Sequence, residues 1–75
     1  MKYLRDNAFL KELGLHIKKV RKKHGYTQEK LAFQIGVEIS QISRIERGVV
    51  NTSVSTIHAI AKELEVETMS LFDFE

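Results

Sequence analysis

Apolar residues recur through most of this chain at the three- and four-residue spacing of amphipathic helices. Between residues 7 and 24, one such set falls on a common helix face and consists of Leu10, Leu13, Gly14, Ile17, Val20, Arg21 and His24. Asn7 has a side chain that can cap the start of this helix, and Gly25 can end it. The pattern therefore predicts a first helix between Asn7 and Gly25.

A second, shorter helix is expected from about residue 28 to residue 35. Thr27 is its expected N-cap, and Tyr26 is placed to pack against Leu31 one turn into the helix. Gly36 can adopt the left-handed backbone that ends a helix. The chain can therefore turn at Gly36 and begin another helix at a steep angle.

The third helix is expected from about residue 38 to residue 47, and Gly48 ends it. Ile42 and Ile45 would anchor one face of this helix to the core. The positions around them are polar and remain for solvent or a partner: Glu38, Ser40, Gln41, Ser43, Arg44 and Arg47. A short helix of this kind after a tight turn has the shape of a DNA-reading element.

The last third of the chain predicts two more helices after a loop at residues 49–52. Ser53 or Thr52 can cap the fourth helix. Its buried stripe would consist of Val54, Ile57, Ile60, Ala61 and Leu64. Thr68 can cap a short fifth helix that contains Leu71 and Phe72. We therefore expect an all-α domain of five helices without a strand.

The segment TQEKLAFQIGVEISQISRIERG, residues 27–48, resembles the helix-turn-helix of the Cro and phage-repressor family, also called the XRE family. The matching positions, in one register, are Thr27-Gln28, Leu31-Ala32, Gly36-Val37, Ile42-Ser43, Glu46 and Gly48. The resemblance implies a lambda-repressor-like DNA-binding domain over residues 10–72. Residues 1–9 would then be an extension or helix start, and residues 73–75 a tail.

In the resembling repressors, outward positions near the start of the third helix lie closest to the major groove. The corresponding base-reading candidates here are Ile39, Ser40, Gln41 and Arg44. Arg44 is the strongest, because a guanidinium can donate two hydrogen bonds to guanine, and Gln41 could pair with adenine. Ile39 has two interpretations, a thymine-methyl contact or a place in the core beside Ile42.

The phosphate-contact candidates come from the start of the second helix, the loop at residue 51 and the end of the first helix. Gln28 resembles a glutamine that the family uses on the DNA backbone, and Asn51 resembles a second such position. Lys30 replaces the family's frequent glutamate and is a weaker candidate. The first helix adds Lys18, Lys19, Lys22 and Lys23.

Charge is unevenly distributed, although the formal net charge is only +2. Residues 1–30 hold nine Lys and Arg against three Asp and Glu, whereas residues 31–75 hold three against seven. The basic cluster has two interpretations: a solvated helix end that suits the helix dipole, or a surface that attracts phosphates. Arg21 and Glu46 fall on inward faces, and the resemblance implies that they form a structural ion pair.

Composition excludes several classes of protein. Seventy-five residues suffice for one domain with a small core, and the absence of cysteine excludes a disulfide framework and a thiolate zinc site. His16, His24 and His58 lack the spacing of a helical metal pair. No apolar run is long enough to span a membrane. We therefore expect a cytoplasmic protein with no enzymatic activity, no cofactor and no metal.

One short reading helix covers few base pairs, so we expect a homodimer on a two-fold symmetric operator. The candidate interface residues are Leu71, Phe72 and Phe74, although Leu71 and Phe72 could instead close the monomer's own core. The predicted function is a bacterial or phage-type transcriptional regulator, a repressor or autoregulator, without a second domain. The alternatives are an antitoxin or restriction-modification controller, or a protein-interaction module. RNA polymerase or another protein is a further candidate partner.

Overall fold

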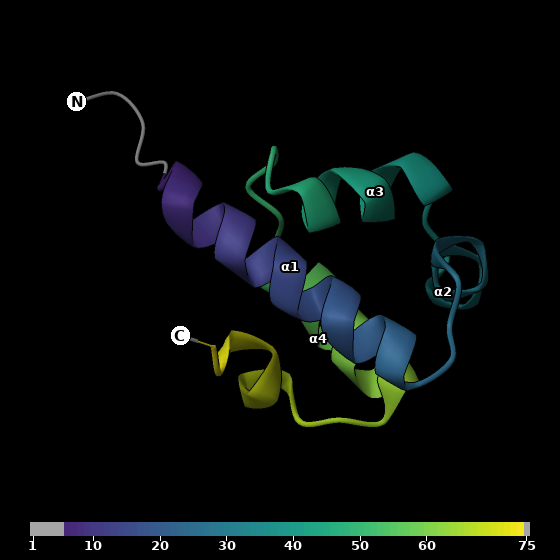
Figure 1. Ribbon diagram of the computed structural model, residues 1–75. Coiled ribbons are helices and arrows are strands. Elements are labelled where there is room, and N and C mark those ends of the chain that lie inside the picture. The colour runs from purple at the N-terminus through teal and green to yellow at the C-terminus, as the bar shows by residue number, and fades with distance from the viewer. Residues whose placement is uncertain (1–5, 75) are drawn as a thin grey trace.

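The computed structural model describes residues 6–74 and shows a bundle of short helices (Figure 1). The elements are α1 (Asn7–Lys23), α2 (Gln28–Ile35), α3 (Ile39–Arg47), α4 (Val54–Leu64) and a 3-10 helix, η1 (Thr68–Phe72). Residues 1–5 and 75, parts of the predicted extension and tail, lie outside the described residues. The described part contains no strand, so the all-α prediction is confirmed.

The prediction of five α-helices is not confirmed, because the last element is a 3-10 helix. Its five residues form the short-range hydrogen bonds of that helix type, from the Ser70 amide to the Glu67 carbonyl and from the Asp73 amide to the Ser70 carbonyl. A segment this short gains little from the α-helical pattern, since most of its amides would lack a partner in either form. Residues 6–74 therefore contain four α-helices and one 3-10 helix.

Most helix ends follow the sequence signals. Thr27 and Ser53 accept the expected capping hydrogen bonds, and Gly36 and Gly48 adopt left-handed backbone at the ends of α2 and α3. The prediction that Asn7 caps α1 was wrong by one position. Asp6 is the N-cap and accepts a hydrogen bond from the Phe9 amide at 3.0 Å.

Two further caps also differ from the sequence prediction. Thr68 does not cap the last helix but is its first residue, and Glu67 precedes it in extended conformation. Likewise, Glu38 is the N-cap of α3 rather than its first helical residue. Neither glutamate makes a capping hydrogen bond through its side chain.

The core lies between α1 and the other helices, with α2 and α3 on one side of α1 and η1 on the other (Figure 1). Its fully buried large side chains are Ile17, Leu31, Ile42, Ile57, Ile60, Leu64 and Leu71. On the predicted inner face of α1, Val20 is partly buried and His24 is exposed, so that face ends near Arg21. Leu71 carries η1 into this core.

Two glycines allow α1 and α3 to approach at backbone distance. A Cβ atom added at Gly14 would stand 2.5 Å from the carbonyl oxygen of Glu46 and closer still to that of Ile45. A Cβ atom at Gly48 would stand 2.5 Å from the Cα atom of Lys11. The last turn of α3 and the glycine that ends it therefore lie directly against the backbone of α1, and no side chain fits between them.

We expect Gly14→Ala to destabilise the protein although alanine is the better helix former by about 1 kcal/mol. The added methyl group meets α3 backbone, which cannot move aside like a flexible side chain, so a net loss of about 1–3 kcal/mol should follow. Urea denaturation measures this loss. Gly25→Ala is the reference, because its added Cβ meets nothing within 4 Å and costs only the strain of a positive φ. A gain in stability for Gly14→Ala would contradict the close packing.

Candidate nucleic-acid interface

The predicted base-reading residues of α3 all lie outside the core. Gln41 and Arg44 are exposed, Ser40 is partly buried, and Ile42 and Ile45 lie on the opposite face in the core. Ile39 is 49% exposed and stands off the core, which favours the contact role over the core role. Gln41 and Arg44 are three residues apart and form one exposed ridge of the helix, whereas Ile39, two residues before Gln41, projects from a different side.

A hollow of about 340 Å³ lies beside this ridge, between α3 and the chain that leads into α4. Gln41 and Arg44 line it on one side, and Asn51 and Thr52 line it on the other. Ser53, the N-cap of α4, and Thr56 in its first turn complete the rim. Asn51 thus shares one concave surface with two of the reading candidates, Gln41 and Arg44.

Arg21, Glu46 and Gln28 form one buried network. The Nε atom of Arg21 donates to Oε2 of Glu46 at 2.6 Å, and Nη2 donates to Oε1 at 3.1 Å. The Oε1 atom also accepts from Nε2 of Gln28 at 2.9 Å. Because a carboxylate only accepts, the NH₂ group of Gln28 must face Glu46. The same carboxylate therefore holds α1, the start of α2 and the end of α3.

This network leaves part of the hydrogen-bonding capacity of Gln28 available for another partner besides Glu46. One N–H of its amide is used by Glu46, whereas the other N–H and the free backbone amides of the first turn of α2 remain. Those groups stabilise negative charge at a helix N-terminus. The partial exposure of Gln28 makes them accessible from outside.

Lys30 points elsewhere than the other phosphate candidates. Its Nζ atom lies 4.8 Å above the centre of the Tyr26 ring, an attractive cation–π arrangement. The Tyr26 hydroxyl in turn donates to Oε2 of Glu63 on α4 at 2.7 Å, and this hydrogen bond raises the pKa of the phenol above its ordinary value. Lys30 is thereby held on the α4 side of α2, away from Gln28 and the basic side chains of α1 that are the stronger phosphate-contact candidates.

The basic cluster of α1 is split between two flanks of the helix. Lys18 and Lys22 are one turn apart and share a flank, whereas Lys19 and Lys23 are rotated from them by about 100°. Lys18 lines a hollow of about 280 Å³ together with Gln28 and Glu46, while Lys19 lines another beside Phe74 of the tail. Only the first pair therefore lies on the side of α2 and α3.

Two cations that sequence reasoning missed complete the hollow around Gln28. Lys11, seven residues before Lys18 on the same flank of α1, and Arg47, at the end of α3, both line it. The seven-residue spacing of Lys11 and Lys18 was a readable signal. Arg47 is one of the polar positions of α3 that the sequence leaves for solvent or a partner, and the Arg21–Glu46 pair implied by the resemblance already brings the end of α3 beside α1.

The three histidines do not form a cluster. His16 donates through Nε2 to the Ser70 carbonyl at 2.9 Å, and His58 lies 2.9 Å from the Thr68 hydroxyl. Over residues 6–74, no three histidine or carboxylate side chains converge as a metal site would require. Across the same stretch, every helix is too short or too polar to cross a membrane.

Known proteins match both the sequence and this arrangement. The HTH_3 family, described as helix-turn-helix, matches residues 17–71. The chain belongs to the HTH_3 family. It is 44% identical over 64 residues to the HTH-type transcriptional regulator SlrR of Bacillus subtilis (strain 168), covering 84% of this chain and 42% of SlrR.

A control protein and a restriction-modification controller protein are also similar to this HTH_3 chain. Control protein C.BamHI of Bacillus amyloliquefaciens is 40% identical over 62 residues, which span 81% of this chain and 76% of that protein. The crystal structure of the controller protein C.AhdI from Aeromonas hydrophila superposes with a TM-score of 0.83 at 34% identity. That match covers 85% of this chain and 97% of C.AhdI.

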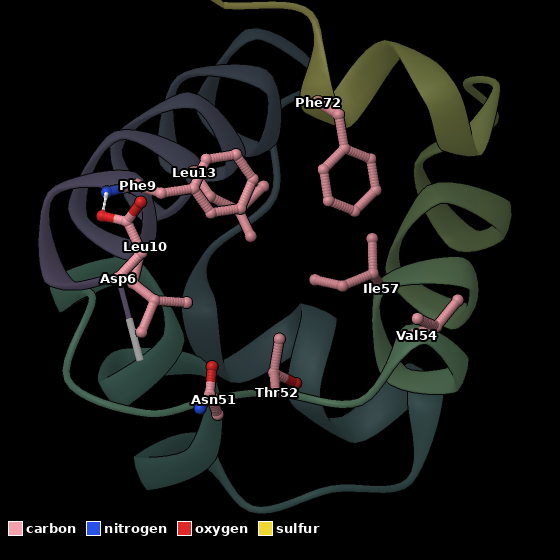
Figure 2. A pocket seen from close by; sticks show the side chains of 9 residues that line it. All are labelled: Asp6, Phe9, Leu10, Leu13, Asn51, Thr52, Val54, Ile57 and Phe72. Atoms are coloured by element: carbon pink, nitrogen blue, oxygen red, sulfur yellow. Dashed lines mark hydrogen bonds between the residues drawn. The ribbon is translucent and has the colours of Figure 1, made fainter. Parts of the chain in front are cut away.

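The three C-terminal residues that were candidates for a dimer interface differ in exposure in this HTH_3 domain. Leu71 is fully buried in its own core and has no surface to offer a partner. Phe72 is 39% exposed and projects toward Ile57 at the edge of an apolar groove (Figure 2). Phe74 packs within its own chain, 5.5 Å from the ring of Phe9 and 5.8 Å from that of His16.

Removing one member of the buried ion pair should be costly. Glu46→Ala leaves the Arg21 guanidinium buried without a carboxylate, and we expect a loss of about 3–5 kcal/mol in the free energy of unfolding. The double variant Arg21→Met with Glu46→Leu removes both charges and should recover most of that loss. Urea denaturation of the variants measures both values. Equal stability of Glu46→Ala and the parent chain would contradict a structural pair.

Proposed function

We propose that this chain is a sequence-specific, double-stranded DNA-binding transcriptional regulator that inserts α3 into the major groove. The observation that carries the proposal is the two-sided α3: Ile42 and Ile45 fix its inner face, and Gln41 and Arg44 stand free on its outer face. Membership in HTH_3 and the likeness to SlrR, a transcriptional regulator by name, support it. A regulator of this kind acts in the cytoplasm, where the DNA is.

Within this proposal, four residues of α3 read bases. Arg44 donates two hydrogen bonds to a guanine edge, and Gln41 pairs with adenine. Ser40, partly buried at the start of the helix, reaches a base or a phosphate. The half-exposed Ile39 contacts a thymine methyl group.

The phosphate contacts surround α3 on two sides. Gln28 and the first backbone amides of α2 hold one phosphate, with Lys18, Lys11 and Arg47 around the same hollow. Asn51 contacts the backbone across the hollow on the other side of α3. Lys22 adds attraction from the α1 flank, while Lys30, Lys19 and Lys23 have smaller roles because they lie elsewhere.

The regulator is proposed to act as a homodimer. A single α3 covers only part of an operator, and two copies related by a two-fold axis would read half-sites about one helical turn apart. The exposed Phe72 supports an interface at the C-terminal side of the domain, where Phe74 packs within its own chain and Leu71 lies inside the core. Repression or autoregulation follows from occupying a promoter.

A restriction-modification controller role is the second candidate. It is favoured by the match to C.AhdI, which covers nearly the whole of that controller protein, whereas the chain spans less than half of SlrR. A controller would bind DNA through the same face of α3. The two roles differ in which genes carry the operator.

Selection from a random duplex pool tests the function directly. The parent chain should enrich a motif with two-fold symmetry, and Arg44→Ala should relax one symmetric position in each half-site, because the lost base contact contributes about 1–3 kcal/mol. Phe33→Ser, on exposed surface of α2, is the control and should select the parent motif. An unchanged motif for Arg44→Ala would refute its role, and no enrichment by the parent would refute the function.

The split of the lysine cluster predicts different salt dependence for two matched pairs. Lys18→Gln and Lys22→Gln should each lower the slope of log affinity against log salt by about 0.9 if the side chain contacts a phosphate. Lys19→Gln and Lys23→Gln remove the same charge from the other flank and should leave the slope unchanged. Fluorescence anisotropy with a labelled duplex over a salt series measures the slopes. Equal effects of the two pairs would contradict the assignment of flanks.

A further inference from the structure

Two consecutive side chains at the start of α3 have no role in holding residues 6–74 together. Glu38 is the N-cap, and its backbone carbonyl accepts from the Gln41 amide at 2.9 Å. Its exposed carboxylate makes no capping hydrogen bond and no ion pair within residues 6–74. Ile39, the first residue of the helix, is 49% exposed. A hydrogen-bond acceptor and an apolar group are therefore adjacent along the chain, and both are open to solvent.

Glu38 and Ile39 begin the helix that is proposed to enter the major groove. The chain turns from α2 directly into this end of α3 (Figure 1). Residues near the N-terminus of a reading helix contact the base edges. A carboxylate there is repelled by the phosphates unless a base donates a hydrogen bond to it, and an apolar side chain gains most from covering another apolar group. The two residues therefore suit a base that offers both a donor and an apolar group.

Each of the four ordinary bases lacks part of this combination. Thymine has a methyl group at C5, but the neighbouring O4 atom is an acceptor and repels a carboxylate. Cytosine has a donor, the amino group at N4, but no methyl group. Adenine and guanine have no methyl group, and guanine presents only acceptors. Cytosine that is methylated at C5 has both groups, and it carries them on adjacent ring atoms.

We propose that α3 reads 5-methylcytosine in duplex DNA, with Glu38 accepting from the N4 amino group and Ile39 covering the methyl group. The inference rests on the proposed function, and it refines the thymine contact of Ile39 to the base that also suits Glu38. Methylation of the operator at C5 of this cytosine would raise the affinity of the regulator. Cytosine methylation is then a signal that the reading helix itself detects.

The proposed contact leaves the guanine contact of Arg44 in place. Arg44 follows Ile39 by five residues, so the helix places the two side chains about 140° apart around its axis and about 7.5 Å apart along it. They therefore address different bases. The position that depends on methylation should be distinct from the position that Arg44→Ala relaxes.

The test begins with selection by the full chain from two random duplex pools, one with ordinary cytosine and one with every cytosine methylated at C5. Synthetic duplexes of the selected motif then carry cytosine, 5-methylcytosine, thymine or uracil at each symmetric pair of pyrimidines in turn, with the matching purine opposite. Fluorescence anisotropy measures their dissociation constants. At one symmetric position, 5-methylcytosine should bind about fourfold tighter than cytosine for each half-site, the effect of one buried methyl group. It should bind about tenfold tighter than thymine, because thymine turns a base hydrogen bond into a repulsion.

Two variants separate the roles of the two side chains. Ile39→Ser should remove the preference for 5-methylcytosine over cytosine and keep the preference for 5-methylcytosine over thymine. Glu38→Gln should do the reverse, because an amide can donate to O4 of thymine as well as accept from N4 of 5-methylcytosine. Ratios between duplexes are compared, since the loss of a negative charge raises the affinity for every duplex alike. Phe33→Ser, on exposed surface of α2, is the matched control and should keep all the ratios.

Equal binding of the cytosine and 5-methylcytosine duplexes at every position would overturn the proposal, as would a methyl preference that survives Ile39→Ser. If Glu38→Gln strengthens binding to all duplexes equally, the carboxylate is only a solvated charge that suits the helix dipole, and its proposed role is wrong. A selected motif without any methyl preference refutes this proposal alone. The absence of a motif from both pools refutes the proposed function, and this proposal with it.

Discussion

The carboxylate of Glu46 is the point on which the geometry of this domain depends. It accepts from Nε and Nη2 of Arg21 on α1 and from the amide of Gln28 at the start of α2, while it belongs to α3 itself. The remaining guanidinium nitrogen, Nη1, donates to the Tyr26 carbonyl at 2.7 Å, just before α2. Because both charges are buried, neither can turn to water, and the three helices keep one relative orientation.

That network exists only because α1 and α3 touch through their backbones. Gly14 lies two helical turns before Arg21 on the same face, and it admits the carbonyl groups of α3 where any side chain would hold them off. Gly48 does the same at the end of α3. An added methyl group at Gly14 would push against the Glu46 backbone, so the glycines and the ion pair depend on the same close approach of α1 and α3.

The sequence predicted what is local and repetitive, and it missed what depends on packing. The bounds of α2 follow from Thr27 and Gly36, whose backbone roles leave few alternatives. At the start of α1, Asp6 and Asn7 have equally good capping side chains, and the structure uses Asp6 rather than the predicted Asn7. Adjacent lysines read as one cluster along the chain, although the helix turns about 100° per residue and divides them. The contact of Gln28 with Glu46 could not be predicted, because it joins distant segments of the chain.

The buried network also determines how the proposed reading face is presented. Glu46 and Arg44 are two residues apart on α3, so a helix places them on nearly opposite sides, one toward α1 and one toward solvent. Any rotation of α3 about its axis would move both side chains together. The hydrogen bonds of Glu46 therefore fix the angle at which Arg44 projects, and the one from Gln28 fixes the proposed phosphate contact relative to it. A base contact and a backbone contact can then be satisfied together without either helix having to reorient on binding.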